Sequence, residues 1–169
     1  MMMVVIKLWP MVHSALKNIP DVVLLSPAIA QNTGAIARTC AGFNTKLHLV
    51  EPLGFEINDR GLKRSGLDYW PYAHMCLHAS FERFLQDQQA AIEEMIFLST
   101  KAEHSIVDFD LGREKLNYIV FGREDAGLPK EFYTQFAHRL VSLPTHTQAI
   151  RSHNLAVAVG ITLGCFLKG

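Results

Sequence analysis

Three short segments hold the residues whose types and spacing allow chemistry. They run Asn32-Thr33-Gly34-Ala35-Ile36-Ala37-Arg38, then Phe121-Gly122-Arg123-Glu124-Asp125-Ala126-Gly127-Leu128-Pro129, then Ser152-His153-Asn154-Leu155. Their amide, hydroxyl, carboxylate and guanidinium groups can orient a polar ligand, and the two glycines of the second segment let the backbone approach it closely. Motifs of phosphate loops, zinc hydrolases and nucleophilic serines do not occur in the sequence. These three segments are therefore the candidates for a binding or catalytic site.

Each segment also has a plainer interpretation. Arg38 follows Gly34 by one helical turn, and it can be a surface arginine whose aliphatic stem is packed. The second segment can be a strand-to-helix turn with Pro129 in the first turn of the helix. Ser152 or Asn154 can cap the last helix and do nothing else. Residue pattern alone leaves these alternatives open.

Short apolar runs alternate with helical patterns from Asp21 onward, and they predict the elements that position the three segments. The runs predict strands at residues 22–25, 46–50, 75–77, 95–98 and 118–121, with a sixth short strand-like segment at 139–143. Helices are expected to open near Asn32 or Thr33 as N-cap, after Ser80, and over the apolar run 155–166. This order predicts an α/β fold with a mostly parallel sheet flanked by helices on both faces.

The loops after four predicted strands are the expected site. Ligands of parallel sheets bind at the carboxyl ends of the strands, which here are the loops after Leu25, Leu98, Phe121 and Leu143. The helix over 155–166 is apolar on all sides, so it needs cover from the core or from another chain.

Composition sets further bounds. The 169 residues fit one domain over 21–169, with a loosely ordered extension over 1–20 and no run long enough to span a membrane. Sixteen basic and sixteen acidic residues cancel, so a nucleic-acid surface must be local or shared between subunits. Cys40, Cys76 and Cys165 form no CxxC pair, which favours free thiols in a reducing compartment, without a disulfide or a zinc site. We therefore expect a cytoplasmic protein.

Together and in this order, the three segments resemble the motifs of the SpoU/TrmH branch of the SPOUT-class RNA methyltransferases. That branch has Asn-x-Gly-x-x-x-Arg, then Phe-Gly-x-Glu-x-x-Gly-Leu, then a Pro-led loop that ends Ser-x-Asn-Leu. The segments 31–34, 47–55 and 62–69 look like those of the minimal YibK/TrmL-type enzymes. The resemblance covers residues 22–166, nearly the whole domain.

The resemblance implies a function and a fold. Such enzymes methylate the ribose 2′-hydroxyl of the tRNA wobble nucleotide with S-adenosyl-L-methionine, and they need no metal. Their C-terminal segment forms a deep trefoil knot, which residue pattern alone would not predict. They form homodimers through the last helix, which agrees with the apolar run 155–166.

The resemblance also implies roles for individual residues. Arg38 orients the acceptor hydroxyl or stabilises charge, because a guanidinium is always protonated and makes a poor base. Asn32 supports Arg38 or the substrate, Glu124 fixes the loop or the acceptor, and Asn154 completes the catalytic group. The cofactor lies near Leu98, Gly122, Leu143, Ser152 and His153. RNA is expected at the basic residues Arg60, Lys63, Arg64 and Arg151, with Tyr69, Trp70 and Tyr72 nearby for stacking.

Three features depart from the family pattern. The loop over 144–152 is one residue longer, Ala156 replaces a serine, and the tyrosine usual near Gly164 is missing. Two alternatives follow: methylation of another tRNA or rRNA site, or a degenerate relative that binds RNA without methylating it.

Overall fold

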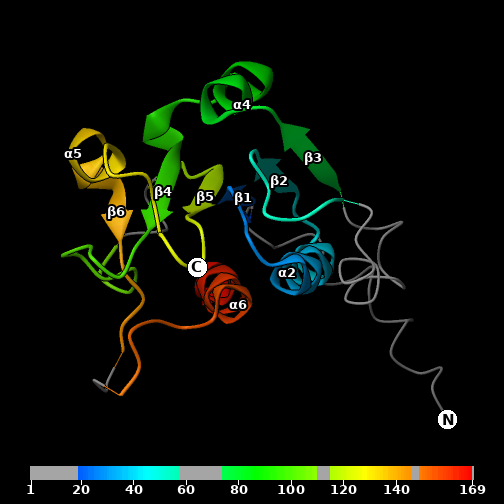
Figure 1. Ribbon diagram of the computed structural model, residues 1–169. Coiled ribbons are helices and arrows are strands. Elements are labelled where there is room, and N and C mark those ends of the chain that lie inside the picture. The colour runs from blue at the N-terminus through cyan, green and yellow to red at the C-terminus, as the bar shows by residue number, and fades with distance from the viewer. Residues whose placement is uncertain (1–18, 58–73, 110–114, 146–148, 169) are drawn as a thin grey trace, which may run out of the picture.

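One parallel sheet of six strands organises the chain. The structure is a computed structural model and describes residues 19–57, 74–109, 115–145 and 149–168. The strands lie in the order β3-β2-β1-β5-β4-β6, and each neighbouring pair is parallel (Figure 1). Their bounds are β1 Asp21–Leu25, β2 Leu47–Val50, β3 Met75–His78, β4 Met95–Leu98, β5 Tyr118–Phe121 and β6 Leu140–Val141. The prediction of an α/β fold with a parallel sheet is confirmed.

Helices cover both faces of the sheet, as predicted. The helices α2 and α6 lie on one face, and α4 and α5 lie on the other (Figure 1). Their bounds are α2 Ala30–Phe43, α4 Phe81–Gln88, α5 Phe132–Gln135 and α6 Leu155–Cys165, with 3-10 turns η3 Ile92–Glu94, η4 Ala137–Arg139 and η5 Phe166–Lys168.

The alternation of side chains along the strands produces two hydrophobic cores, one on each face of the sheet. Successive side chains of a strand point to opposite faces, so Val22 and Leu24 of β1 join the core beneath α2 and α6. Val23 and Leu25 join the other core, with the aromatic side chains of α4 and α5. All four are buried, which is why β1 reads as a continuous apolar run.

The start of α2 differs from the sequence prediction. Neither Asn32 nor Thr33 is the N-cap, because the helix begins at Ala30 and Ile29 holds the cap position without a side-chain hydrogen bond. The carboxylate of Glu124 instead accepts a hydrogen bond from the Ile29 N–H, at 3.3 Å. Those two residues are 95 positions apart, so no pattern of neighbouring residues reveals the contact.

Two other helix starts agree with the predictions: Ser80 is the cap of α4, and Asn154, one of two candidates, is the cap of α6. The Ser80 hydroxyl accepts a hydrogen bond from the Arg83 N–H at 3.1 Å, and the Asn154 Oδ1 accepts one from the Ala156 N–H at 2.9 Å. Pro129 is not in the first turn of α5, because that helix begins three residues later.

Helix α6 is only half covered within one chain. Val159 and Leu163 are fully buried, whereas Val157 is 51% and Ile161 is 43% exposed. Leu167, in the following turn, is 51% exposed. The expectation that this helix must be covered is therefore met on one side, and an apolar strip remains on the other.

A buried polar chain ties the β2–β3 end of the sheet to α4. His48 Nδ1 lies 3.0 Å from His78 Nε2, His48 Nε2 lies 3.5 Å from Asp21 Oδ2, and His78 Nδ1 lies 3.1 Å from Asp87 Oδ2. Phe84 packs edge-on against both imidazoles, which excludes water from them. This network joins β1, β2, β3 and α4.

Asp21 and Cys40 have shifted pKa values. Burial raises the pKa of Asp21, but hydrogen bonds from His48, the Lys46 N–H and the Thr45 hydroxyl outweigh it and leave the pKa below its ordinary 3.8. Its contribution to stability is therefore complete above that value and is lost as the pH falls through the folded pKa. Burial raises the pKa of the Cys40 thiol to about 12, so this cysteine is protonated at neutral pH.

Arg139 fixes the far edge of the sheet. Its guanidinium is buried, donates to the Met95 carbonyl at 2.7 Å and the Glu93 carbonyl at 2.9 Å, and lies 5.4 Å from the ring centroid of Phe109. These contacts hold the start of β6 against the start of β4, which sets where their loops emerge.

Candidate active site

The middle of the sheet has a topological switch point at the ends of β1 and β5. On one side of β1 the sheet continues with β2 and β3, and on the other side of β1 it continues with β5, β4 and β6. The loops that follow β1 and β5 therefore diverge at a topological switch point, where parallel sheets bind their ligands. Ser26, which follows β1, has φ 49°, so the backbone turns sharply as it leaves the strand.

Glu124 joins these two loops. Its carboxylate accepts hydrogen bonds from the N–H groups of Ala28 at 2.7 Å and Ile29 at 3.3 Å, and from Asn32 Nδ2 at 3.1 Å. Three donors on one carboxylate fix its orientation, and a negative charge is favourable at the N-terminus of α2. The second segment thus holds the first in place.

Asn154 extends this arrangement to the third segment. Its Nδ2 donates to Asn32 Oδ1 at 3.0 Å, while its own Oδ1 caps α6. Asn32 consequently donates to Glu124 and accepts from Asn154, so both ends of its amide are used. Three predicted catalytic residues, Glu124, Asn32 and Asn154, therefore form one hydrogen-bonded chain, called here the motif bridge.

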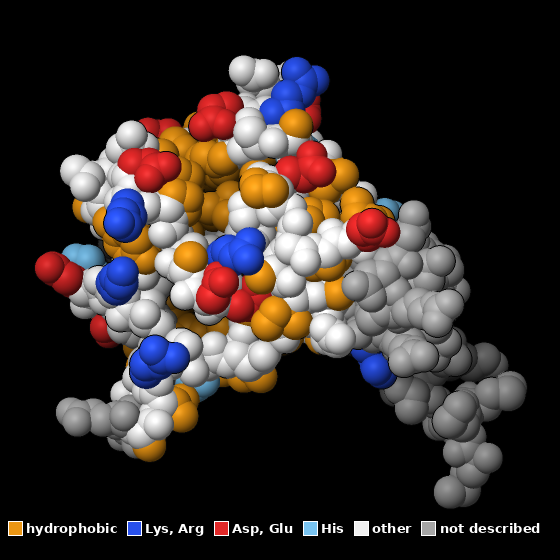
Figure 2. All heavy atoms as spheres, viewed as in Figure 1, with side chains coloured by type: hydrophobic (Ala, Val, Ile, Leu, Met, Phe, Trp, Pro, Cys, Tyr) orange, Lys and Arg blue, Asp and Glu red, His pale blue; other side chains and the backbone are white. Residues whose placement is uncertain are grey.

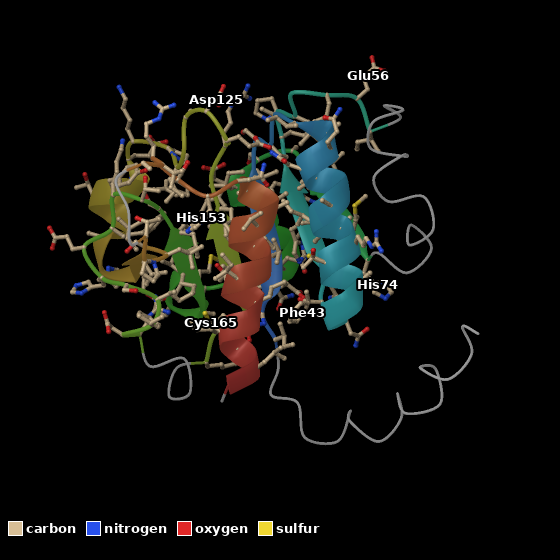
Figure 3. The ribbon with its side chains drawn as sticks, turned by 90° about the horizontal axis from the view of Figure 1, so that it is seen from below. Phe43, Glu56, His74, Asp125, His153 and Cys165 are labelled. Carbon is tan, nitrogen blue, oxygen red and sulfur yellow. The ribbon has the colours of Figure 1, made fainter. Side chains whose placement is uncertain are left out.

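The motif bridge lies where two helices begin. Helices α2 and α6 pack against each other, and Figure 3 shows Asp125 at the end where both start and Phe43 near the opposite end. The two helix N-termini thus point toward the loop after β5. Backbone N–H groups at helix starts favour ligand atoms that accept hydrogen bonds.

Glycines allow the loop after β5 to fold back on itself. The Arg123 N–H donates to the Gly127 carbonyl at 3.0 Å and the Gly127 N–H donates to the Arg123 carbonyl at 2.8 Å. Gly127 has φ 73°, and a Cβ on Gly122 would collide with the backbone of Gly127 and Leu128. The two glycines are required here, one for its conformation and one for its close approach.

Sequence reasoning missed the role of Arg123. Its Nε donates to Asp125 Oδ1 at 2.7 Å, and its Nη1 donates to the Ser26 carbonyl at 3.4 Å. The hydrogen bond from Arg123 lowers the pKa of Asp125. Arg123 and Glu124 therefore hold the loop after β1 from two directions, and adjacency to Glu124 was the only signal in the sequence.

The predicted cofactor residues lie at neighbouring strand ends. Leu98, Gly122 and Leu143 follow or end β4, β5 and β6, and β4 pairs with both of the others. The Ser99 N–H donates to the Val141 carbonyl at 2.9 Å, which holds the loops after β4 and β6 together.

The last two predicted cofactor residues lie before α6. Ser152 is exposed and His153 is half-buried. His153 stands on the opposite side of α6 from α2 (Figure 3).

Arg38 lies elsewhere on α2. It is exposed, six residues beyond Asn32, which is about 9 Å along the helix axis and about a third of a turn out of line. The structure therefore brings Asn32, Glu124 and Asn154 together but sets Arg38 apart from them.

The predicted RNA-binding residues are mostly outside the described part of the chain. Arg60, Lys63, Arg64 and the aromatic residues Tyr69, Trp70 and Tyr72 lie there, whereas Arg151 is exposed in the loop before α6. Figure 2 shows basic side chains interspersed with acidic ones on the face that it presents.

The described residues offer neither a cluster of metal ligands nor a membrane-spanning helix. In residues 19–57, 74–109, 115–145 and 149–168, no group of three or more His, Cys, Asp or Glu side chains is placed to hold a metal ion. Over the same ranges, no helix has the length and apolar character needed to cross a membrane.

Known proteins match this chain over most of its length. A protein of Lactococcus lactis subsp. cremoris is 43% identical over 136 residues, 80% of each chain. The tRNA (cytidine(34)-2′-O)-methyltransferase of Methylovorus glucosotrophus is 42% identical over 143 residues, 81% of this chain and 89% of the relative. A solved structure on the 2-OH methylation of C/U34 on tRNA superposes with TM-score 0.76 at 38% identity, covering 86% of this chain and 92% of that one.

The family model described as SpoU rRNA Methylase family matches residues 20–164, which includes all three segments, α2 and all but the last residue of α6. The chain belongs to the SpoU methylase family.

Proposed function

We propose that this protein is an S-adenosyl-L-methionine-dependent tRNA ribose 2′-O-methyltransferase that acts on the wobble nucleotide, cytidine or uridine 34. The motif bridge is the observation that carries the proposal, because it assembles three distant segments at the ends of the paired strands β1 and β5. The relatives named for the same reaction, at about 40% identity, support the substrate.

The strand ends fit a nucleoside cofactor. The loops after β5 and β6 lie on either side of the loop after β4, and the backbone N–H and C=O groups of these loops can read an adenine. We assign cofactor binding to Leu98, Gly122, Leu143, Ser152 and His153. The sulfonium of S-adenosyl-L-methionine supplies an activated methyl group, so the protein has only to position the acceptor and assist loss of its proton.

The motif bridge prepares the acceptor side. Glu124 holds Asn32 and the start of α2 in one position, and Asn154 holds the start of α6 beside them. Arg38 binds the RNA next to the acceptor hydroxyl and stabilises the charge that develops on it. Because its guanidinium stays protonated, the proton leaves to an RNA phosphate or to water.

Three further features complete the proposal. Two subunits pair through the exposed strip of α6, Val157, Ile161 and Leu167, because such a strip is too apolar to remain in water. The C-terminal segment forms a trefoil knot, a proposal supported by its return from β6 at the sheet edge to α2 at the centre. Basic residues of both subunits, Arg151 and the cluster Arg60, Lys63 and Arg64 among them, contact tRNA in the cytoplasm.

Methyl transfer is tested with labelled S-adenosyl-L-methionine and transcripts of every tRNA and of the rRNAs, followed by mapping of the methylated nucleotide. Label on the 2′-oxygen of nucleotide 34 supports the proposal. Label on another nucleotide supports a different RNA substrate, and cofactor-independent RNA binding without transfer supports the inert relative.

Arg38→Ala is expected to lower the transfer rate by about two orders of magnitude or more, because charge at the acceptor loses its partner. Calorimetry should show cofactor affinity unchanged within about twofold, since the guanidinium serves the acceptor. Arg83→Ala, which removes an exposed arginine paired with Asp87 on α4, is the control and should leave both values unchanged. Loss of cofactor affinity in Arg38→Ala would show that this residue serves a different role.

Ile161→Asp is expected to convert a dimer into monomers at micromolar concentration, because the interface would have to bury a carboxylate. Sedimentation velocity measures the change. Val107→Asp alters a more exposed apolar side chain, 66% against 43%, that is not part of α6, and should remain dimeric. Val159 is unsuitable for this test because it is fully buried inside the subunit. A dimer that survives Ile161→Asp would place the interface elsewhere.

A further inference from the structure

Tyr133 of α5 reaches toward the proposed cofactor loops from the opposite side to α2 and α6. Its hydroxyl lies 3.0 Å from the Ser99 Oγ, just after β4. The same hydroxyl would lie 3.4 Å from a Cβ built on Gly127, so it also packs against the loop after β5. Lys101 stands over its ring, with the Nζ 5.1 Å from the centroid. None of the three sequence segments includes Tyr133.

Ser99 is the centre of the turn that follows β4. Its Oγ accepts a hydrogen bond from the Lys101 N–H at 3.1 Å, and its carbonyl accepts one from the Ala102 N–H at 3.3 Å. Its N–H donates to the Val141 carbonyl. The Ser99 hydroxyl therefore provides one of the three contacts that hold this turn.

That hydroxyl is held from two sides. Because the Lys101 N–H occupies one lone pair of the Ser99 Oγ, its single hydrogen and remaining lone pair are left for Tyr133. The contact spans 34 residues and links α5 to the turn. Without it, the Ser99 side chain can rotate, and the Lys101 N–H loses its fixed acceptor.

We propose that Tyr133 is a positioning residue of the cofactor site. Its hydroxyl holds the turn 99–102 against the loop that carries Gly127. The distance between the loops after β4 and β5 is therefore set before the cofactor binds. Preorganisation of this kind raises affinity because less ordering remains to be done on binding. The inference rests on the proposed function for the identity of the ligand, and on the contacts of the free protein for the rest.

Tyr133→Phe removes one oxygen and keeps the ring, so it tests the hydroxyl alone. Amide exchange of the free protein, followed by NMR or mass spectrometry, should be faster at Lys101 and Ala102 and unchanged in β1. Calorimetry with S-adenosylhomocysteine should show affinity about five- to tenfold weaker, the scale of one lost hydrogen bond. In steady-state transfer, KM for the cofactor should rise by the same factor with kcat within about twofold, because the chemistry is untouched.

Two matched variants sharpen the result. Tyr118→Phe makes the same chemical change in a tyrosine near His48 and Phe84, away from the turn, and should bind as the wild type. Ser99→Ala should weaken binding, and adding Tyr133→Phe to it should cause no further loss, because both changes break one contact.

The outcomes separate this inference from the proposed function. Wild-type exchange at Lys101 and Ala102 in Tyr133→Phe overturns the inference, whatever the cofactor does. Faster exchange throughout β1 overturns it too, since the hydroxyl would then support the whole fold. If the wild type does not bind S-adenosylhomocysteine, the proposed function fails, and the exchange data still decide whether Tyr133 holds the turn.

Discussion

Gly122→Ala is expected to abolish detectable binding of S-adenosylhomocysteine, a loss of about two orders of magnitude or more for a site displaced by this much. The added Cβ would overlap the Gly127 carbonyl group and the Leu128 nitrogen, which are backbone atoms and cannot rotate away. The loop after β5 would have to open, which breaks its two Arg123–Gly127 hydrogen bonds and displaces Glu124. Calorimetry and circular dichroism measure binding and folding separately.

Gly42→Ala is the matched control for this change. It adds the same methyl group to a glycine of α2 that has open space around its Cβ position, with no atom within 4 Å. Alanine is the better helix former, so this variant should be as stable as the wild type or slightly more so. A Gly122→Ala protein that binds like the wild type would mean that the loop after β5 does not shape the cofactor site.

Glu124→Gln should lower methyl transfer by about two orders of magnitude, because the motif bridge depends on a carboxylate with no hydrogen of its own. The Ala28 N–H, the Ile29 N–H and the Asn32 amide all donate to Glu124. A glutamine has only one oxygen that accepts hydrogen bonds. Its NH₂ group is a donor, so it cannot take the place of the second carboxylate oxygen. Asn32 and Asn154 then lose their fixed orientation, and kcat falls more than cofactor affinity does.

Asp125→Asn tests whether charge alone explains such a loss. Asp125 is the neighbouring carboxylate, is exposed, and bonds the side chain of Arg123. Exposed ion pairs contribute little to stability, so this variant should keep its loop in place and its transfer rate within about threefold. Equal activity of Glu124→Gln and the wild type would show that the bridge is structural packing without catalytic consequence.

Ala156 is compatible with the motif bridge. A serine at this position would supply a hydroxyl, but the contact that the structure uses is the Ala156 backbone N–H, which donates to Asn154. Any residue except proline provides that donor. The degenerate alternative therefore depends on the longer loop over 144–152 and on the tyrosine missing near Gly164, and the transfer assay decides it.

Sequence determined the elements of this protein that depend on neighbouring residues. Short apolar runs predicted all six strands, Ser80 was predicted as a helix cap, and Asn154 was one of the two caps predicted for the last helix. Those features arise from the alternation of side chains and from local hydrogen bonds, which short stretches of sequence encode directly. The three segments were also recognisable, because their residue types and order are unusual.

Only the tertiary structure decided how those segments act together. The bond from Asn32 to Glu124 crosses 92 residues and that from Asn154 to Asn32 crosses 122, and both depend on which strands are adjacent in the sheet. The strand order puts β1 beside β5, so the true anchor of α2 is Glu124 and the predicted caps are wrong. The same reason applies to Arg123 and Tyr133, because their hydrogen-bond partners, Ser26 and Ser99, are close to them in space but distant in the sequence. Contacts of this kind follow from packing of the whole chain, which residue types and spacing do not specify.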